Sequence, residues 1–377
     1  MLQKRNIHGI YIAIVLTIMV LPLIMMNRRK NEISIIDNAC LPELPAVSEW
    51  VHAQDMLEEY VNKRIGFREQ AVYAYETGNS VIFHKLEHNL YTFGENGHIM
   101  GNMPEYIEDY QHLNLERDEE FVNAFAEWLI RVNQYLGEKN IPFLYFLAPD
   151  KKSVYPECMS QNINVKGSLS RTDMLLEQLE AQGLSYIYPR EEFLKAKKEN
   201  DIYYVRYDAL HWNDFGNLLG NQMIDRYFCS KTRGLIPLDE SQLELYFECR
   251  EKMVQSCFYV YEEVPSYGLK NEQGIVDVSE EDAFGREKTT GDFEHYINTG
   301  LSQAPSILIL HDSYMVNSAK FYKGRYHEVV SVHNSNYQML QDLVEHYNPD
   351  VVLFENAERI LASGTFQVED LITTDLQ

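Results

Sequence analysis

The chain has 377 residues, 45% of them hydrophobic and 24% charged, which excludes global disorder and collagen-like repeats. Its 33 Lys and Arg stand against 57 Asp and Glu, and the net charge of −24 disfavours binding to a phosphate backbone, so we expect no nucleic-acid partner. The chain contains 26 Tyr but only 3 Trp. Because tyrosine suits sugar faces as well as ordinary protein cores, the composition leaves both interpretations open.

The N-terminal segment contains an uncharged apolar run, residues 10–26, with basic residues on both sides. Together with Ile7 and Gly9, the run approaches the roughly 20 residues that cross a bilayer, and no small-x-small cleavage site follows it. This pattern predicts an uncleaved signal anchor over residues 1–30, preceding the main fold as one transmembrane helix. A buried core helix is the alternative.

The orientation of this anchor depends on two opposing signals. The downstream flank carries slightly more positive charge, which by itself favours an outside N-terminus. A very short tail before a long acidic domain, however, usually stays in the cytoplasm. We therefore expect a single-pass protein of the cell membrane whose large domain lies outside the cytoplasm.

Residues 31–114 are interpreted as a linker followed by an N-terminal extension. Asn31 to Pro45 is polar and contains proline. Apolar residues from Met56 to Ile65 recur at helical spacing and stop at Gly66, which predicts a helix. Residues 90–100 read LYTFGENGHIM, in which turn residues separate two short apolar runs, as in a hairpin.

From residue 115 to 377 the pattern alternates between helices and strands. The predicted helices include residues 121–136, 175–179 and 215–227. The predicted strands are residues 141–147, 184–188, 202–206, 306–310, 329–332 and 351–354. This alternation predicts an α/β fold, in which a mainly parallel sheet has helices on both faces as a three-layer sandwich. The acidic, turn-rich segment near 262–300 is expected to be a surface insertion or long loop.

The five cysteines are too few for a disulfide scaffold, and none lies in a CxxC motif that would suggest a thiolate zinc site. Cys249 and Cys257 are close enough in sequence to pair across a hairpin in an oxidising compartment. A second metal pattern, H-x-x-E-H, occurs at residues 84–88 and is found in some zinc peptidases. Because no third ligand can be identified, we predict no metal site.

Residues that follow strands are the first candidates for chemistry, because ligands bind beyond the carboxyl ends of parallel strands. Strand 306–310 leads into His311-Asp312-Ser313-Tyr314 and then into a stretch, residues 315–322, expected to be helical. A serine at such a turn can use helix N-terminal amides to stabilise an oxyanion, but it needs a base. Asp208 and His211 can supply that base and the carboxylate that orients it. The alternative is a capping serine and a structural histidine.

Other residues at the same sheet edge are candidates for substrate contacts. Lys151 and Tyr155 follow strand 141–147 and could contact sugar hydroxyls, although a structural loop is an equal alternative. Asn334 and Asn336 follow strand 329–332 and could donate an amide hydrogen to an oxyanion. His311 and Tyr314 flank the candidate nucleophile and complete this set.

Five motifs together resemble the alginate O-acetyltransferase-type SGNH hydrolase-like family, which includes AlgJ, AlgX and the DHHW proteins. In chain order they are GFRE (66–69), APDKKSVYPE (148–157), YDALHWNDFG (207–216), HDSY (311–314) and PDVVLFENAER (349–359). The resemblance implies a circularly permuted SGNH fold that transfers acetyl groups to hydroxyls of an exported polysaccharide. It assigns Ser313 as nucleophile, His211 as base and Asp208 as the residue that orients His211. Arg68 and Arg359 recur at motif positions, where we expect structural ion pairs.

The same resemblance implies a membrane-bound O-acyltransferase partner that delivers acetyl groups across the bilayer. The sequence contains no Gly-rich phosphate loop, so we expect no nucleotide cofactor. Two departures from the family pattern leave alternatives open. Two residues separate Asp208 from His211, where many members have one, and His311 stands where the family has glycine. A carbohydrate esterase with the same triad, or a non-catalytic polysaccharide-binding or assembly protein, therefore remains as an alternative.

Overall fold

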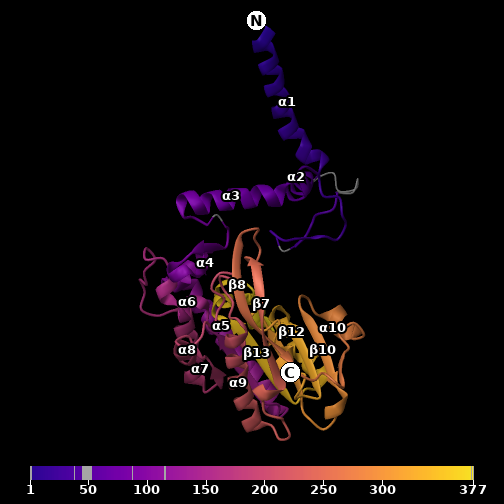
Figure 1. Ribbon diagram of the computed structural model, residues 1–377. Helices are drawn as coiled ribbons and strands as arrows, with labels where there is room; N and C mark the ends of the chain where they lie inside the picture. Colours follow the sequence, from indigo (N-terminus) through magenta and orange to yellow (C-terminus); the bar gives the residue numbers. More distant parts are fainter. Residues whose placement is uncertain are drawn as a thin grey trace. The chain divides into compact units, whose positions relative to one another are not determined.

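The computed structural model describes residues 2–37, 39–44, 53–86, 88–113, 116–374 and 376 (Figure 1). The chain divides into two compact units, which are described separately. The first unit comprises Met1–His88 and Arg250–Tyr261. The second unit comprises Asn89–Cys249 and Glu262–Gln377.

The first unit is mainly helical. Its elements are α1 (Leu2–Ile24), β1 (Ile33–Ser34), β2 (Ala39–Cys40), α2 (Ala53–Arg64) and α3 (Arg68–Phe83). The buried guanidinium of Arg64 holds the segments between these helices, because it donates to the carbonyl oxygens of Asn27, Arg29, Leu41 and Pro42 over 2.6–3.1 Å. Arg68 forms the expected ion pair, with Asp37 at 2.7 Å.

Two further sequence patterns in this unit bear on membrane insertion and on metal binding. The structure does not support the expected transmembrane segment: within the described residues, no helix is both long enough and apolar enough to span a bilayer. The H-x-x-E-H histidines do not share a helix, because α3 ends at Phe83 and His84 adopts a left-handed conformation with φ of 51°. Glu87 lies outside the described residues. No cluster of three or more potential metal ligands occurs in the part of the chain that is described.

The second unit is built on one sheet of seven strands, in the order β6-β5-β13-β11-β12-β10-β9. Strands β6, β5, β13, β11 and β12 are parallel, whereas β10 pairs antiparallel with β12 and β9 pairs antiparallel with β10. The strand bounds are β5 (Phe143–Ala148), β6 (Tyr186–Ile187), β9 (Ile275–Asp277), β10 (Phe293–Asn298), β11 (Ser306–His311), β12 (Glu328–His333) and β13 (Val351–Ala357). The sequence prediction of an α/β fold with a mainly parallel sheet is therefore confirmed.

Helices pack on both faces of this sheet. On one face, the core joins alternate residues of the central strands to α5 (Glu116–Glu138), α7 (Arg171–Gln182), α11 (Leu340–Tyr347) and α12 (Val368–Thr373). On the other face, α9 (Asp214–Lys231) approaches β5 closely at Gly220, where an added Cβ would lie 3.3 Å from Phe146. Residues 143–148 are all buried, as expected for a strand covered on both sides.

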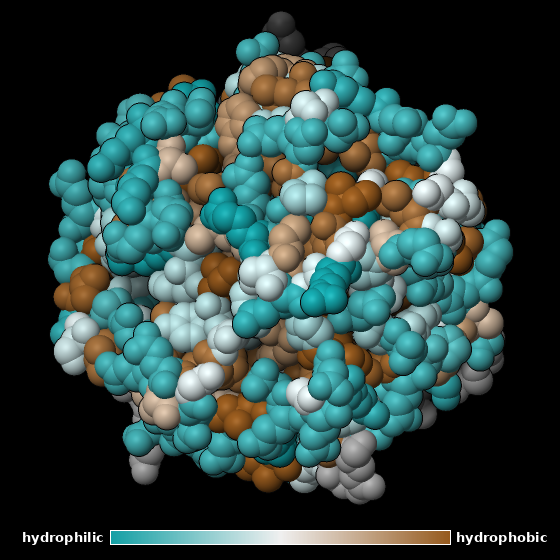
Figure 2. Space-filling model, turned by 90° about the horizontal axis from the view of Figure 1, so that it is seen from below, coloured by the Kyte–Doolittle hydropathy of each residue, from teal (hydrophilic) through white to brown (hydrophobic). Residues whose placement is uncertain are grey.

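The remaining elements of the chain are short helices and two hairpins. The helices are α4 (Pro104–Tyr110), α6 (Lys151–Val154), α8 (Arg190–Ala196) and α10 (Ala283–Lys288). The hairpins are β3 (Tyr91–Phe93) with β4 (Ile99–Gly101) and β7 (Leu243–Lys252) with β8 (Tyr259–Leu269). Figure 2 shows a face of the molecule that is mainly hydrophilic, with hydrophobic residues scattered across it.

Three local predictions differ from the structure. Residues 262–300 are not one long loop, because they contain β9 and β10 at the sheet edge, and an edge strand with a solvated face needs few apolar residues. Residues 202–206 form only an isolated bridge, between Tyr203 and Trp212. Residues 315–322 are turns followed by the 3₁₀ helix η6 (Ala319–Phe321), so no α-helix begins at Ser313.

All five cysteines are free thiols, and Cys249 does not pair with Cys257.

Candidate active site

Ser313 lies on a tight turn just beyond β11. The turn is held by the carboxylate of Asp312, which accepts hydrogen bonds from the amides of Tyr314 (2.8 Å) and Ala357 (2.7 Å). The Asp312 amide in turn donates to the buried Glu355 carboxyl at 3.0 Å. Burial and the nearby Asp312 raise the pKa of Glu355 well above its usual range. These contacts fix the backbone of the turn and leave the Ser313 side chain exposed.

Asp208 and His211 lie on the loop that precedes α9. One carboxylate oxygen of Asp208 accepts from the amides of Leu210 (2.8 Å) and His211 (3.0 Å), which closes the turn. The other accepts from His211 Nδ1 at 2.8 Å. Burial alone would raise the pKa of Asp208, but the contacts with His211 and the two amides lower it, so the carboxylate stays ionised. The spacing of two residues between Asp208 and His211 is therefore compatible with a direct contact.

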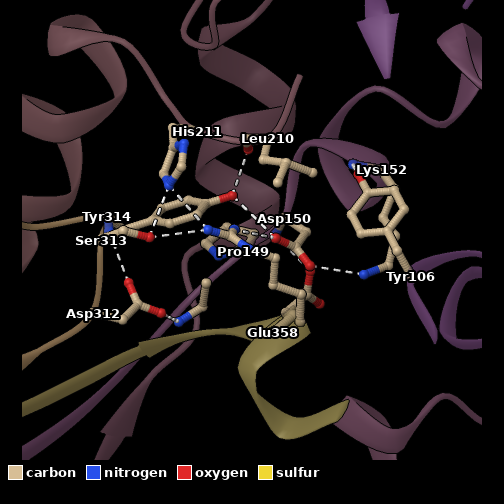
Figure 3. A network of polar contacts seen from close by, with 12 residues as sticks. Tyr106, Pro149, Asp150, Lys152, Leu210, His211, Asp312, Ser313, Tyr314 and Glu358 are labelled. Atoms are coloured by element: carbon tan, nitrogen blue, oxygen red, sulfur yellow. Dashed lines mark hydrogen bonds and ion pairs between the residues drawn. The ribbon is translucent and has the colours of Figure 1, made fainter. Parts of the chain in front are cut away.

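The imidazole reaches the serine from this loop. His211 Nε2 lies 2.8 Å from Ser313 Oγ, and Figure 3 shows the ring directed at that oxygen. Because Nδ1 faces a carboxylate, it carries the proton in the neutral ring and leaves Nε2 as acceptor for the serine proton. The structure thus brings Asp208, His211 and Ser313 together in one hydrogen-bonded chain.

Two aromatic residues lock the two loops to each other. Trp212 Nε1 donates to the Tyr314 carbonyl oxygen at 2.7 Å, and the Tyr314 hydroxyl donates to the Leu210 carbonyl oxygen at 2.7 Å. The rings of Trp212 and Tyr314 meet edge to face, with centroids 4.9 Å apart. Tyr314 is buried, so it positions the triad and does not offer the substrate contact that was predicted for it.

A residue outside the predicted triad also touches its reacting atoms. Arg359 follows β13 in the 3₁₀ helix η8 (Glu358–Ala362), and its Nη2 lies 3.2 Å from Ser313 Oγ and 3.0 Å from His211 Nε2. Its Nη1 donates to Asp150 at 3.0 Å, and the guanidinium stacks 4.6 Å from the Tyr314 ring centroid. The expected ion pair of Arg359 is present, but the side chain also reaches the nucleophile.

Asp150 belongs to a buried series of alternating charges. Lys152 Nζ bridges Asp150 (2.7 Å) and Asp109 (2.9 Å), and Asp109 contacts Arg171 at 3.2 Å. Burial of Asp150 favours its neutral form, but Lys152 and Arg359 lower the pKa of this carboxyl below its usual value. The series therefore runs from Arg171 to Arg359 and ends at the triad. Figure 3 shows Asp150 and Lys152 of this series in the same network as His211 and Ser313.

The other predicted contact residues lie in the interior. Lys151 is buried, and its Nζ donates to the carbonyl oxygens of Ile99 (2.7 Å) and Tyr204 (2.6 Å). Burial lowers the pKa of Lys151 to about 8. Tyr155 is also buried, and its hydroxyl accepts from the Ile202 amide. Both residues hold the neighbouring loops in place, and their burial argues against the predicted sugar contacts.

The two asparagines and His311 are similarly engaged. Asn336 Nδ2 donates to the carbonyl oxygens of Thr290 and His333, both at 2.8 Å. Asn334 is fully buried, and its Nδ2 donates to the Glu355 carbonyl oxygen at 2.9 Å. His311 is buried and bonds the Asp312 carbonyl oxygen through Nδ1 at 2.7 Å. The structure therefore does not place these three side chains as exposed donors beside Ser313.

The sequence comparison can now be set beside this geometry. Residues 108–245 match the model of a protein family described as "ALGX: SGNH hydrolase-like domain, acetyltransferase AlgX". The AlgX-type resemblance is confirmed. The matched residues include Asp208 and His211, whereas Ser313 lies beyond them. None of the curated proteins compared matches the chain in sequence.

Two solved structures are similar in fold to most of this chain. Bacillus cereus PatB1 with a sulfonyl adduct has 15% identity and a TM-score of 0.55, covering 74% of this chain and 96% of PatB1. A DHHW family protein from Eubacterium siraeum has 12% identity and a TM-score of 0.51, covering 78% of this chain and 98% of that protein. At these identities the similarity shows a shared fold.

The sequence motifs predicted only a structural ion pair for Arg359 and assigned no role to Asp150. The signal that could have found them is topological. Asp150 follows β5 and Arg359 follows β13, and both strands lie beside β11 in the sheet. Parallel neighbours bring the residues after their carboxyl ends to one edge, where Ser313 also lies.

Proposed function

We propose that this protein is a serine-dependent O-acetyltransferase that transfers acetyl groups to hydroxyls of a polysaccharide. The observation that carries the proposal is the continuous contact from Asp208 through His211 to the exposed Ser313, with distances of 2.8 Å at both steps. The match to an AlgX-type acetyltransferase family supports acetyl transfer as the chemistry.

The proposed reaction has two half-reactions. His211 Nε2 takes the Ser313 proton while Oγ attacks the acetyl carbonyl, and the carbonyl electron pair moves onto its oxygen. When this oxyanion collapses, the bond to the donor's leaving group breaks and His211 gives that group its proton. An acetyl-serine remains. His211 then takes a proton from a sugar hydroxyl, which attacks the acetyl-serine, and Ser313 recovers its proton as the acetyl ester of the sugar leaves.

The oxyanion needs donors near Ser313, and the backbone offers one. Among the described residues, the Ser313 N–H has no hydrogen-bond acceptor. A free amide next to the nucleophile can donate to an oxyanion that forms on the attacked carbonyl. The exposure of Ser313 also suits a polymeric acceptor, whose hydroxyls approach from solvent.

The location and partner belong to the same proposal and rest on the sequence. The uncharged run at residues 10–26 supports attachment to the cell membrane, and the very short tail before it supports a second unit outside the cytoplasm. A membrane-bound O-acyltransferase would then supply acetyl groups, because acetyl-CoA is cytoplasmic. Protease added to intact spheroplasts should digest residues 31–377. Full protection would refute the extracytoplasmic location.

The nucleophile is tested with an electrophile of the kind seen in a related structure. Since PatB1 has been solved with a sulfonyl adduct, an aryl sulfonyl fluoride should label this protein on Ser313, as read by peptide mass spectrometry. Ser313→Ala should abolish labelling and acyl-enzyme formation, and Ser302→Ala, which changes another exposed serine, should not. Labelling at a residue other than Ser313 would contradict the assignment.

The base and the acceptor are tested by turnover of an acetyl ester. His211→Ala should reduce turnover nearly as much as Ser313→Ala because triad members act as a unit, and Asp208→Asn should reduce it about 10²- to 10⁴-fold. An added oligosaccharide should receive the acetyl group. Release of acetate alone, whatever glycan is added, would favour the esterase, and absence of turnover and acyl-enzyme would favour a binding protein.

A further inference from the structure

The guanidinium of Arg359 is the one charged donor that the described residues place within hydrogen-bond distance of Ser313 Oγ. Nη2 lies 3.2 Å from that oxygen, on the serine that His211 also contacts. In the resting site, the Ser313 hydroxyl donates to His211 Nε2 and uses a free lone pair to accept from Arg359, whose Nη2 also lies 3.0 Å from His211 Nε2. When the proton moves to His211, the guanidinium already faces the charge that develops on Oγ.

The other side chains that could stabilise this charge are already engaged. Asn336 donates both of its amide hydrogens to backbone carbonyl oxygens. Asn334 and His311 are buried, and each forms a hydrogen bond with a backbone carbonyl oxygen. No α-helix begins at Ser313 to add its N-terminal amides. The site therefore combines one backbone donor, the Ser313 N–H, with one side-chain donor, Arg359.

We propose that Arg359 is a catalytic residue of the reaction inferred above: its Nη2 donates to Ser313 Oγ as that oxygen loses its proton, and to the adjoining oxyanion once the acetyl carbonyl is attacked. No atom is transferred by Arg359, which stays protonated throughout. The inference rests on the proposed function, because it assigns a role within the same acyl transfer.

The buried charge series gives Arg359 the fixed position that this role needs. Nη1 is bound to Asp150, and Asp150 is bound to Lys152, which Asp109 holds from the other side. Tyr314 supports the plane of the guanidinium, and its hydroxyl oxygen lies 3.1 Å from Asp150 Oδ1. A donor held in place before the reaction needs no reorganisation as charge develops. Asp150 and Lys152 are accordingly positioning residues that act through Arg359.

The commitment of Nη1 to Asp150 also limits what Arg359 can bind. A bidentate pair with a carboxylate needs two adjacent N–H groups of one guanidinium. Here Nη1 is bound to Asp150, and Nη2 lies beside Ser313 Oγ and His211 Nε2. The role of Arg359 is therefore on the nucleophile, and the substrate does not need to be an acidic sugar.

The test measures acylation separately from later steps, using the burst of p-nitrophenol released from p-nitrophenyl acetate by the full chain. Arg359→Met should lower the acylation rate about 10²- to 10³-fold, with a much smaller change in KM, as for loss of an oxyanion donor. Arg359→Lys keeps the charge but not the fork, and should fall between the parent and Arg359→Met. Asp150→Asn should reduce the rate less than Arg359→Met, because the guanidinium is kept but loses its anchor.

Two further measurements separate catalysis from folding. Arg325→Gln breaks another buried Arg–Asp pair, with Asp225, and should lower the unfolding temperature without changing the acylation rate of folded protein. Arg359→Ala should regain acylation when millimolar guanidinium chloride is added, whereas potassium chloride should have no effect. The parent should respond to neither salt. Such rescue is not expected of a residue that only holds the fold.

The outcomes distinguish this inference from the function on which it rests. If the parent forms an acyl-enzyme on Ser313 and folded Arg359→Met forms it at the same rate, the role of Arg359 is refuted and the triad stands. If Arg359→Ala is folded and inactive but guanidinium does not restore it, while Arg325→Gln is equally inactive, the role is also refuted. If the parent forms no acyl-enzyme, both the function and this inference fall.

Discussion

Replacing Lys152 by methionine isolates the energetic contribution of the buried charge series. Lys152 Nζ is the shared cation between Asp150 and Asp109, and all three side chains are at most 7% exposed. Methionine keeps most of the apolar stem and removes the charge. Breaking a buried pair by removing one partner costs about 3–5 kcal/mol. Because Asp150 keeps Arg359 and Asp109 keeps Arg171, we expect Lys152→Met to lie at the lower end, about 3 kcal/mol.

The loss of stability in Lys152→Met should depend on pH, and the lowered pKa of Asp150 gives the direction of this dependence. In the parent, Asp150 has a lowered pKa, so its contribution to stability is present above the unfolded pKa of about 3.9 and is lost as pH falls through the folded value. Without Lys152, less positive charge opposes burial of Asp150, and its pKa rises. The variant's carboxylate can then protonate more easily in acid. The difference between parent and variant should be largest near pH 7 and shrink as pH approaches 4.

The assay is urea unfolding followed by tryptophan fluorescence, since Trp128 and Trp212 are buried in the second unit. The matched control is Lys323→Met, which removes a lysine paired with the exposed carboxylate of Glu272 and should cost less than about 1 kcal/mol. A cost for Lys152→Met no larger than the control's, or a cost that is equal at pH 7 and pH 4.5, would refute the reasoning.

Two other predictions concern stability elsewhere in the chain. His295 lies between the carboxylates of Asp282 (2.7 Å) and Glu328 (2.8 Å). Burial opposes the charged form of His295, but both carboxylates raise its pKa. The stabilisation by charged His295 is therefore complete below about pH 6.5 and is lost as pH rises through the folded pKa. His295→Gln should therefore lower the unfolding temperature more at pH 6 than at pH 8.5, and an equal loss at both would contradict the charged form. Gly66→Ala would place a methyl group 2.7 Å from the backbone just beyond α1 and should destabilise the first unit by about 1–3 kcal/mol, measured by thermal unfolding. The control, Gly78→Ala, meets nothing within 4 Å on α3 and should be neutral or stabilising by up to about 1 kcal/mol.

The central strands could be predicted because their sequences meet a single strong requirement. Strands covered on both faces need continuous apolar residues, and residues 141–147, 306–310 and 351–354 have them. Strands β9 and β10 lacked this signal because β9 has only three residues and β10 mixes apolar and polar side chains that are mostly half-buried. Residues 315–322 looked helical from composition, but successive turns, such as Ser318 N–H to the Met315 carbonyl oxygen, replace the helix there.

The site was predictable where local sequence carried the geometry. Asp208 and His211 meet through a turn of four residues, so their spacing was informative. Arg359 could not be assigned in the same way, because its contact with Ser313 depends on how β13 aligns with β11. Lys151 and Tyr155 were predicted at the correct sheet edge but with the wrong exposure, since the sequence did not show that β4 and the loop 202–205 cover them.

The contacts of Trp212 and Tyr314 make catalytic competence depend on parts of the chain that are distant in sequence. The two halves of the triad come from loops about a hundred residues apart, and Tyr314, which follows β11, contacts Leu210 and Trp212 on the first loop. Contacts that distant in sequence form slowly, because a long loop must close before they gain stability. A nascent chain that ends before β11 carries Asp208 and His211 but no nucleophile. Acyl-enzyme formation would therefore report only completely folded molecules. A partly folded or prematurely ended chain would not react with acetyl donors.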